Sequence, residues 1–164
     1  MNPLDALAWV LDSEEGGPPM DAPYSERRGW CYALALRAFV ERPAIFPQGD
    51  RVVVSLVHGF PRLQVPGRPI YGHAWVEIET ESKLPAEFVT KGWPETYTTS
   101  TVYDPTTNTT MPKPLYYRLG HIVEAQSGRW VDAKDVLDAL LEHGTVGCWA
   151  PVEGLPEPPV WAED

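Results

Sequence analysis

The stretch that decides the fold is Gly29-Trp30-Cys31-Tyr32-Ala33-Leu34-Ala35-Leu36-Arg37-Ala38-Phe39-Val40. It is apolar at almost every position. A helix that is apolar on nearly every face must be buried on nearly every face, so this segment is predicted to be a central helix around which the chain packs. Pro43 is expected to end the helix, because proline has no N–H to donate and clashes with the preceding turn.

Cys31 lies at the start of this predicted helix. The first backbone N–H groups of a helix have no intrahelical partner and the helix dipole favours negative charge there, so a thiolate is stabilised relative to an ordinary cysteine, whose pKa is about 8.5. This position suits a nucleophile. The alternative is a structural role, since free cysteine is often buried and behaves as a small hydrophobe.

Length and composition indicate one globular α+β domain over residues 1–164. It comprises a helix and linker (1–22), a core (23–150) and a proline-rich acidic tail (151–164). The chain has 13 Lys and Arg against 23 Asp and Glu, a formal net charge of −10. Nonspecific nucleic-acid binding depends on cationic contacts, so no nucleic-acid partner is expected. Neither a GxGxxG nor a GxxxxGK[ST] phosphate loop occurs, and no cofactor is expected.

The chain has only two cysteines, Cys31 and Cys148. They lie far apart and show no CxxC or Cys/His spacing of the structural zinc type. A chain of this size with a proper core does not need a disulfide, so a reducing, cytoplasmic location is expected. The first residues lack a basic segment and a long apolar run, so neither a signal peptide nor a membrane span is predicted. The oligomeric state stays open.

The hydrophobic pattern predicts helices and strands on both sides of the central helix. An opening helix is expected at 4–11, capped by Asn2, and a second well-signalled helix at 133–142, with Asp132 as its N-cap and Gly144 after its end. The other expected elements are strands at 51–57, 72–79 and 99–103, an irregular loop at 59–72, an insertion at 80–98, and a fourth strand or bent pair within 115–119 and 121–123.

Three residues of the predicted elements form a candidate catalytic triad. Cys31 starts the central helix, His73 opens a strand, and Asp104 ends the next strand. Neighbouring antiparallel strands place the start of one beside the end of the other, so His73 and Asp104 are expected to meet at one edge of a sheet. In such a triad the thiolate attacks an acyl carbon, the imidazole moves the proton, and the carboxylate orients the imidazole.

Three segments of the chain resemble the motifs of a known family. These are Gly29-Trp30-Cys31-Tyr32-Ala33, Gly72-His73-Ala74-Trp75-Val76-Glu77 and Val102-Tyr103-Asp104-Pro105-Thr106. Together they are similar to the transglutaminase-like branch of the papain-like cysteine protease superfamily, in particular its small phage or bacterial members. The resemblance spans residues 28–106 and implies a papain-like fold, in which a central helix packs on a small antiparallel sheet and a further helix follows. It also implies Cys31 as nucleophile, His73 as base and Asp104 as the orienting group.

One feature departs from the papain-type pattern. Those proteases have a glutamine shortly before the cysteine for the oxyanion hole, whereas this chain has Ser25-Glu26-Arg27-Arg28. The Cys31 backbone N–H, with the Tyr24 hydroxyl or the Trp30 indole, is the expected replacement. Substrate contacts are expected from Tyr24, Trp30, His58 and Trp75, although Trp75 equally suits the core.

The predicted function is thiol-dependent acyl transfer on an amide or peptide substrate, as in a peptidase, amidase, deamidase or transglutaminase. The alternative from another class is a protein-binding module of the same fold with a vestigial triad. A zinc site built from Cys31, His58, His73 and Asp104 is a further alternative, since these are ligand types, but their spacing is not diagnostic and no metal is expected.

Overall fold

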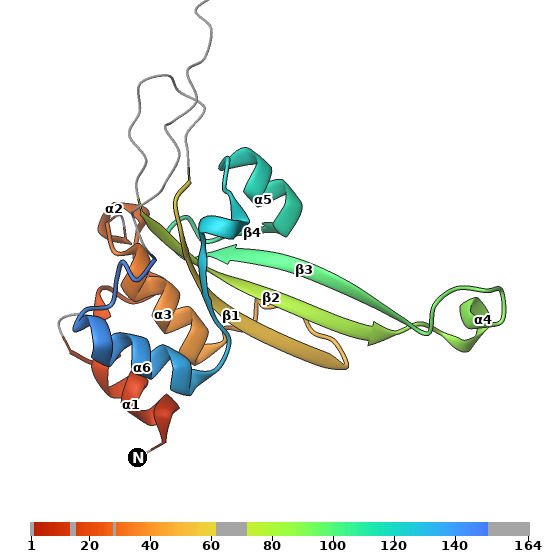
Figure 1. The fold of residues 1–164 in the computed structure, drawn as a ribbon, viewed down its shortest axis with the longest axis horizontal. Coiled ribbons are helices and arrows are strands. Elements are labelled where there is room, and N and C mark those ends of the chain that lie inside the picture. Colours follow the sequence, from red (N-terminus) through yellow and green to blue (C-terminus); the bar gives the residue numbers. More distant parts are fainter. Residues whose placement is uncertain (1, 14–15, 28, 62–71, 151–164) are drawn as a thin grey trace, which may run out of the picture.

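The structure is a computed structural model that describes residues 2–13, 16–27, 29–61 and 72–150. Within these residues a five-stranded antiparallel sheet and six α-helices form a mixed α/β fold (Figure 1). The strand order is β4-β3-β2-β1-β5. The strands are β1 (Arg51–Gly59), β2 (His73–Lys83), β3 (Thr96–Asp104), β4 (Thr109–Pro112) and β5 (Gly128–Trp130). The helices are α1 (Pro3–Leu11), α2 (Tyr24–Arg27), α3 (Cys31–Glu41), α4 (Ala86–Val89), α5 (Lys113–Leu119) and α6 (Ala133–His143), with a 3₁₀ turn, η2, at Glu124–Gln126.

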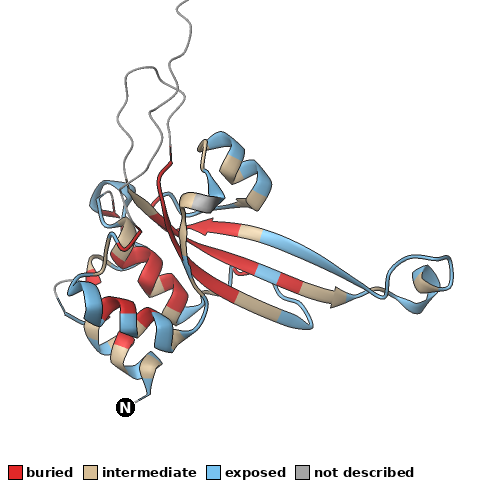
Figure 2. Cartoon of the chain, viewed as in Figure 1, coloured by how far each residue is buried: buried red, intermediate tan, exposed pale blue. Residues whose placement is uncertain are grey.

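The central helix predicted from the sequence is α3. Six of its eleven residues are buried, and it packs on β1 and β2 while α1 and α6 lie beside it (Figures 1 and 2). It begins at Cys31, two residues later than the apolar stretch, because Gly29 has a φ of +88° that a helix does not allow. It ends at Glu41, and Arg42 in the left-handed region leads into Pro43.

The sheet buries a different set of side chains on each face. Ala74, Val76 and Ile78 of β2 join the main core with α3. Trp75 points to the other face, where it packs with two neighbouring strands and is covered by α5 and the segment that follows. Successive side chains of a strand point in opposite directions, so β2 has one face in the main core and one face towards α5.

Strands β2 and β3 are longer than their predicted segments and form an extended hairpin that projects from the body, with α4 near its tip (Figure 1). Part of the predicted insertion, residues 80–98, is therefore regular sheet. The alternation of apolar and polar residues in this segment is weak because this part of the hairpin does not cover a core. Residues 91–100 are all exposed.

The helices at both ends of the described chain confirm the sequence-based signals. The Asn2 side chain accepts a hydrogen bond from the Asp5 N–H at the start of α1, and Asp132 does the same for Lys134 in α6. Gly144 follows α6 with a φ of +70°. The predicted fourth strand at 115–119 is wrong. This segment is helix α5, and Pro114 lies in its first turn, where proline is well tolerated.

Two expectations lie outside the described residues: most of the irregular loop at 59–72, and the acidic tail 151–164 with Trp161. Trp149, just before that tail, is buried. Among the residues that the structure does describe, no helix is both long and apolar enough to cross a membrane.

The role of α6 in the core gives a direct stability test. Leu140 is 6% exposed and belongs to the core, whereas its neighbour Leu141 is 72% exposed. Leu140→Ala is expected to lower the free energy of unfolding by about 2–5 kcal/mol. The same change at Leu141 should stay within about 0.5 kcal/mol. Urea unfolding of both variants measures this difference, and equal losses would show that α6 does not pack as described.

Candidate active site

Cys31 is the first residue of α3 and is partly exposed. The preceding turn passes through Gly29 at positive φ, and the Trp30 side chain makes no capping hydrogen bond to the helix. The N–H groups of the first turn are therefore not occupied by a side chain at the N-cap. The sulfur thus lies at a helix end that favours a negative charge.

His73 and Asp104 meet at one end of the sheet, as predicted. His73 is the first residue of β2 and Asp104 the last of β3, and the two strands are antiparallel, with Val76 opposite Tyr103. The Nε2 atom of His73 lies 2.8 Å from Oδ2 of Asp104. Cys31 also acts on the same imidazole and helps to raise its pKa.

The electrostatics of the pair favour a charged imidazole. Burial alone would lower the pKa of His73, but the hydrogen bonds to Asp104 and Cys31 and the charges of both groups raise it to about 10. Burial would likewise raise the pKa of Asp104, yet its bonds to His73, Tyr116 and the Thr106 N–H hold that pKa below its usual value. The site therefore holds an imidazolium and a carboxylate at neutral pH.

The three side chains open onto a cleft of about 740 Å³. Cys31, His73 and Asp104 all line it. The described part of its wall also includes the apolar side chains of Met111, Leu119 and Ile122 and the hydroxyl-bearing Thr106, Thr107 and Thr109. The sulfur is thus reachable from solvent, and a bound molecule would meet mainly apolar and hydroxyl groups.

The four predicted substrate contacts differ in their positions. Tyr24 lines the cleft and is half exposed. Trp30 is 40% exposed but is not among the residues that line the cleft. His58 and Trp75 are 0% exposed, which corrects the expectation that they touch substrate. Trp75 lies on the same face of β2 as His73, but α5 covers that face at Trp75.

His58 lies in an aromatic cluster behind the cleft. Its ring packs against Tyr32, Trp130 and Trp149, and its Nδ1 accepts a hydrogen bond from the Trp149 N–H. Burial, with the nearby charges of His143 and His73, lowers the pKa of His58 to about 3, so the ring is neutral. His58 therefore supports the wall of the site instead of acting in the proton transfer.

Two contacts to the Asp104 turn were missed in the sequence. The Tyr116 hydroxyl donates to Oδ2 of Asp104 at 2.8 Å, and the buried Arg27 donates to the Pro105 carbonyl at 2.6 Å. Neither had a local signal, because each partner is distant in the chain. The sequence offers one hint for Tyr116, which is its place in an apolar, tyrosine-rich segment. The sequence pattern predicts that segment to be a strand.

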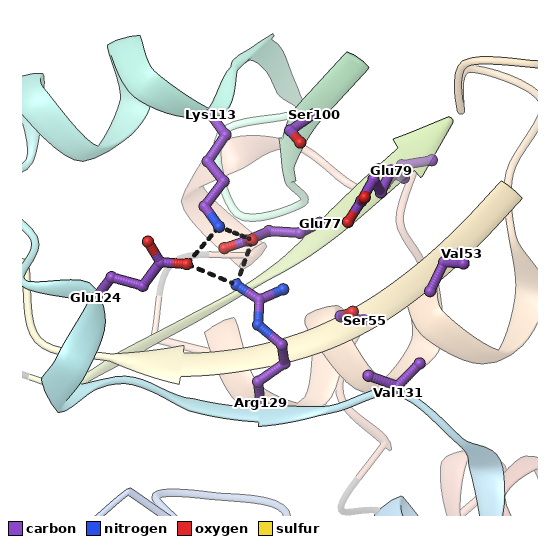
Figure 3. A pocket seen from close by; sticks show the side chains of 10 residues that line it. Val53, Ser55, Glu77, Glu79, Ser100, Lys113, Glu124, Arg129 and Val131 are labelled. Carbon is purple, nitrogen blue, oxygen red and sulfur yellow. Dashed lines mark hydrogen bonds and ion pairs between the residues drawn. The ribbon is translucent and has the colours of Figure 1, made fainter. Parts of the chain in front are cut away.

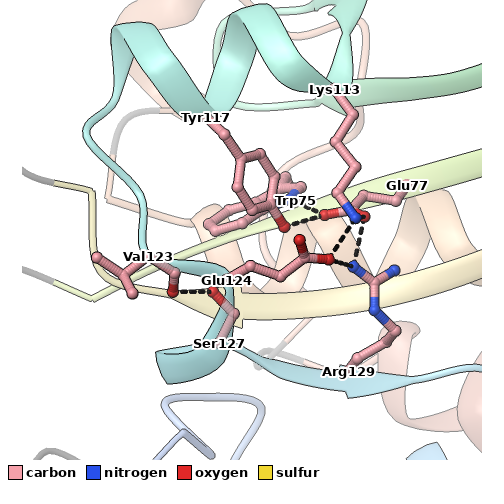
Figure 4. Close-up of polar contacts among 8 residues, drawn as sticks. All are labelled: Trp75, Glu77, Lys113, Tyr117, Val123, Glu124, Ser127 and Arg129. Atoms are coloured by element: carbon pink, nitrogen blue, oxygen red, sulfur yellow. Dashed lines mark hydrogen bonds and ion pairs between the residues drawn. The ribbon is translucent and has the colours of Figure 1, made fainter.

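A cluster of charged side chains around the buried Glu77 lies farther along the α5-covered face of the sheet. Glu77 of β2 accepts hydrogen bonds from the Trp75 indole, the Tyr117 hydroxyl and Arg129, and forms an ion pair with Lys113 at 3.2 Å (Figure 4). Glu124 joins the two cations, and the group borders a small pocket of about 260 Å³ (Figure 3). The bonds of Glu77 outweigh its burial and lower its pKa.

This charge cluster attaches α5 to the sheet next to the site. Neighbouring residues of α5 have separate partners: Tyr117 bonds Glu77, and Tyr116 bonds Asp104. Lys113, at the start of the same helix, also bonds Glu124 at 2.5 Å. The orientation of the Asp104 carboxylate thus depends on a helix that is itself held by Glu77.

Within the described part of the chain, no three His, Cys, Asp or Glu side chains are grouped as metal ligands. In particular, His58 uses Nδ1 for the Trp149 N–H and does not line the cleft. Comparisons of the chain with protein-family models, curated proteins and solved structures find no match. The inference about function therefore depends on the site itself.

The coupling of His73 to Asp104 predicts a change in its titration. Asp104→Asn removes the negative charge, so the pKa of His73 should fall well below about 10. Tyr116→Phe keeps the carboxylate and should move it much less. NMR titration of the His73 imidazole measures both. An unchanged pKa in Asp104→Asn would contradict the pairing.

The buried neutral state of His58 predicts acid destabilisation. Its pKa is 6.5 in the unfolded chain and about 3 in the folded one, so protonation favours the unfolded chain as the pH falls from 6.5 towards 3. His58→Asn retains an acceptor and does not titrate. The variant should therefore lose less of its unfolding free energy between pH 7 and pH 4 than the wild type, as measured by urea unfolding. Equal losses would show that His58 does not contribute.

Proposed function

We propose that this protein catalyses thiol-dependent acyl transfer on an amide or peptide substrate, with Cys31 as nucleophile, His73 as acid and base, and Asp104 as the orienting group. The observation that carries the proposal is that Cys31, His73 and Asp104 line one open cleft, with His73 hydrogen-bonded to Asp104 at 2.8 Å and with Cys31 helping to raise the pKa of His73. A group that is only structural does not need solvent access to the sulfur.

The first step would be attack of the Cys31 thiolate on the substrate carbonyl carbon, which forms a C–S bond and moves an electron pair onto the carbonyl oxygen. The imidazolium of His73, charged up to about pH 10, then donates its proton to the leaving amine as the C–N bond breaks. The product of this half-reaction is a thioester on Cys31 and a free amine.

The second step would use His73 as a base. In the thioester Cys31 no longer carries a charge or a proton, so it no longer helps to raise the pKa of His73. The imidazole then takes a proton from water or an amine, which attacks the thioester and releases Cys31. Water gives hydrolysis and an amine gives transamidation, and both acceptors remain within the proposal.

The arrangement also supports a transglutaminase-like member of the papain-like superfamily as the class of this protein. A cysteine-bearing helix packs on an antiparallel sheet, and the His and Asp come from adjacent strands. The described cleft wall fits an acyl group with an apolar side chain, because Met111, Leu119 and Ile122 face it.

Alkylation of Cys31 by iodoacetamide tests the proposal against a non-catalytic binding module. In a Cys148→Ala background, the rate should stay high well below pH 7. His73→Ala should lower it about tenfold or more at pH 6, because the sulfur then behaves as an ordinary thiol. Cys31→Ser in the same background is the control for labelling elsewhere.

A covalent acyl adduct provides the second readout. Incubation with a set of acyl p-nitrophenyl esters, followed by mass spectrometry, should find an adduct on the Cys31 peptide and none in His73→Ala at the same time points. Ordinary thiol behaviour in alkylation, together with no adduct, would overturn the enzymatic proposal and favour the binding module.

A further inference from the structure

Tyr32, the residue after Cys31, occupies a space that two glycines keep open. A Cβ atom on Gly72 would lie 2.2 Å from the Tyr32 hydroxyl, and one on Gly147 would lie 2.0 Å from the ring carbon Cγ. Both distances are shorter than real contacts allow, so any other residue would displace the tyrosine. Glycine at these two positions therefore permits the close approach that this ring requires.

The Tyr32 ring is also held in place by the side chains that pack against it. His58, buried and neutral, packs edge-on against Tyr32 with ring centroids 4.8 Å apart. Tyr32 itself is partly buried against the main core. The hydroxyl is therefore presented in one position before any substrate binds, which is the condition for a preorganised hydrogen-bond donor.

The Tyr32 hydroxyl lies close to Gly72, the residue before His73. Tyr32, Gly72, Cys31 and His73 all line the same cavity, and the charge of Cys31 acts on the phenol. Burial, a hydrogen bond to Cys148 and the charges of both cysteines raise the pKa of Tyr32 well above its usual value. The phenol thus keeps its proton at neutral pH.

The Tyr32 hydroxyl has only a weak hydrogen-bond acceptor in this structure. The Cys148 thiol is directed to the Ala150 carbonyl, with a sulfur-to-oxygen distance of 3.7 Å, so the phenol donates to the sulfur. Sulfur is a weak acceptor. A negatively charged oxygen within reach would be a much stronger one, so the proton can be redirected at little cost.

We propose that the Tyr32 hydroxyl is a catalytic hydrogen-bond donor to the oxyanion that forms when Cys31 attacks a carbonyl, together with the backbone N–H at the start of α3. This inference rests on the proposed function. It fills the place of the glutamine that papain-type proteases use, and it assigns to Tyr32 a role that the sequence had suggested for Tyr24 or Trp30.

Two reactions of the same sulfur separate this role from a structural one. Acylation by p-nitrophenyl butyrate passes through an oxyanion, whereas alkylation by iodoacetamide at a saturated carbon does not. Tyr32→Phe should lower the acylation rate constant, followed by p-nitrophenolate release, by about 10²–10³-fold. It should change the alkylation rate less than threefold. Tyr97→Phe, on the exposed hairpin, is the matched control and should leave both rates unchanged.

A second variant keeps the test decisive if Tyr32→Phe folds poorly. Gly72→Ala retains the phenol but displaces it, and should also reduce acylation far more than alkylation. Near-wild-type acylation in Tyr32→Phe would overturn the assignment, as would an equal fall of both rates or a large loss in Tyr24→Phe alone. A wild type that neither acylates nor alkylates rapidly would instead overturn the proposed function.

Discussion

The antiparallel pairing of β2 and β3 is the constraint on which the candidate site depends. It brings the first residue of one strand beside the last residue of the other, and thereby sets the 2.8 Å contact between His73 and Asp104. A shift of one residue in this pairing would turn every side chain of one strand to the opposite face. The same shift would place Glu77 in the main core and Ile78 among the charged groups that now surround Glu77, so burial on both faces protects the register that the site needs.

The free-energy cost of burying the Glu77 carboxylate is offset by its ion pairs and hydrogen bonds. Glu77 is almost fully buried, but it is bonded by two cations, a tyrosine and an indole. An unpaired carboxylate at this position would cost several kcal/mol. The function of this cluster is indirect: it holds α5, and α5 brings Tyr116 to Asp104. The geometry of the candidate triad thus depends on contacts between α5 and Glu77, outside the triad itself.

In the proposed mechanism, the two sides of the Cys31 sulfur have different tasks. On the His73 side, a raised pKa supplies a proton for the leaving group and a charge next to the sulfur. On the Tyr32 side, a buried phenol that does not lose its proton faces the place where an oxyanion would form. His58 packs against Tyr32, and burial with the nearby charges of His143 and His73 keeps its ring neutral.

The sequence by itself determined the parts of the site that have local causes. The apolar run at 29–40 requires a buried helix, cap residues identify α1 and α6, and the alternation in β2 assigns its two faces, because these patterns follow from the periods of helix and strand. The order of Cys31, His73 and Asp104 was also visible. Only the tertiary structure decided what covers each face. Trp75 and His58 are sealed, Tyr116 reaches Asp104, and Gly72 and Gly147 make room for Tyr32, since each of these contacts joins residues far apart in the chain and depends on packing that no local pattern encodes.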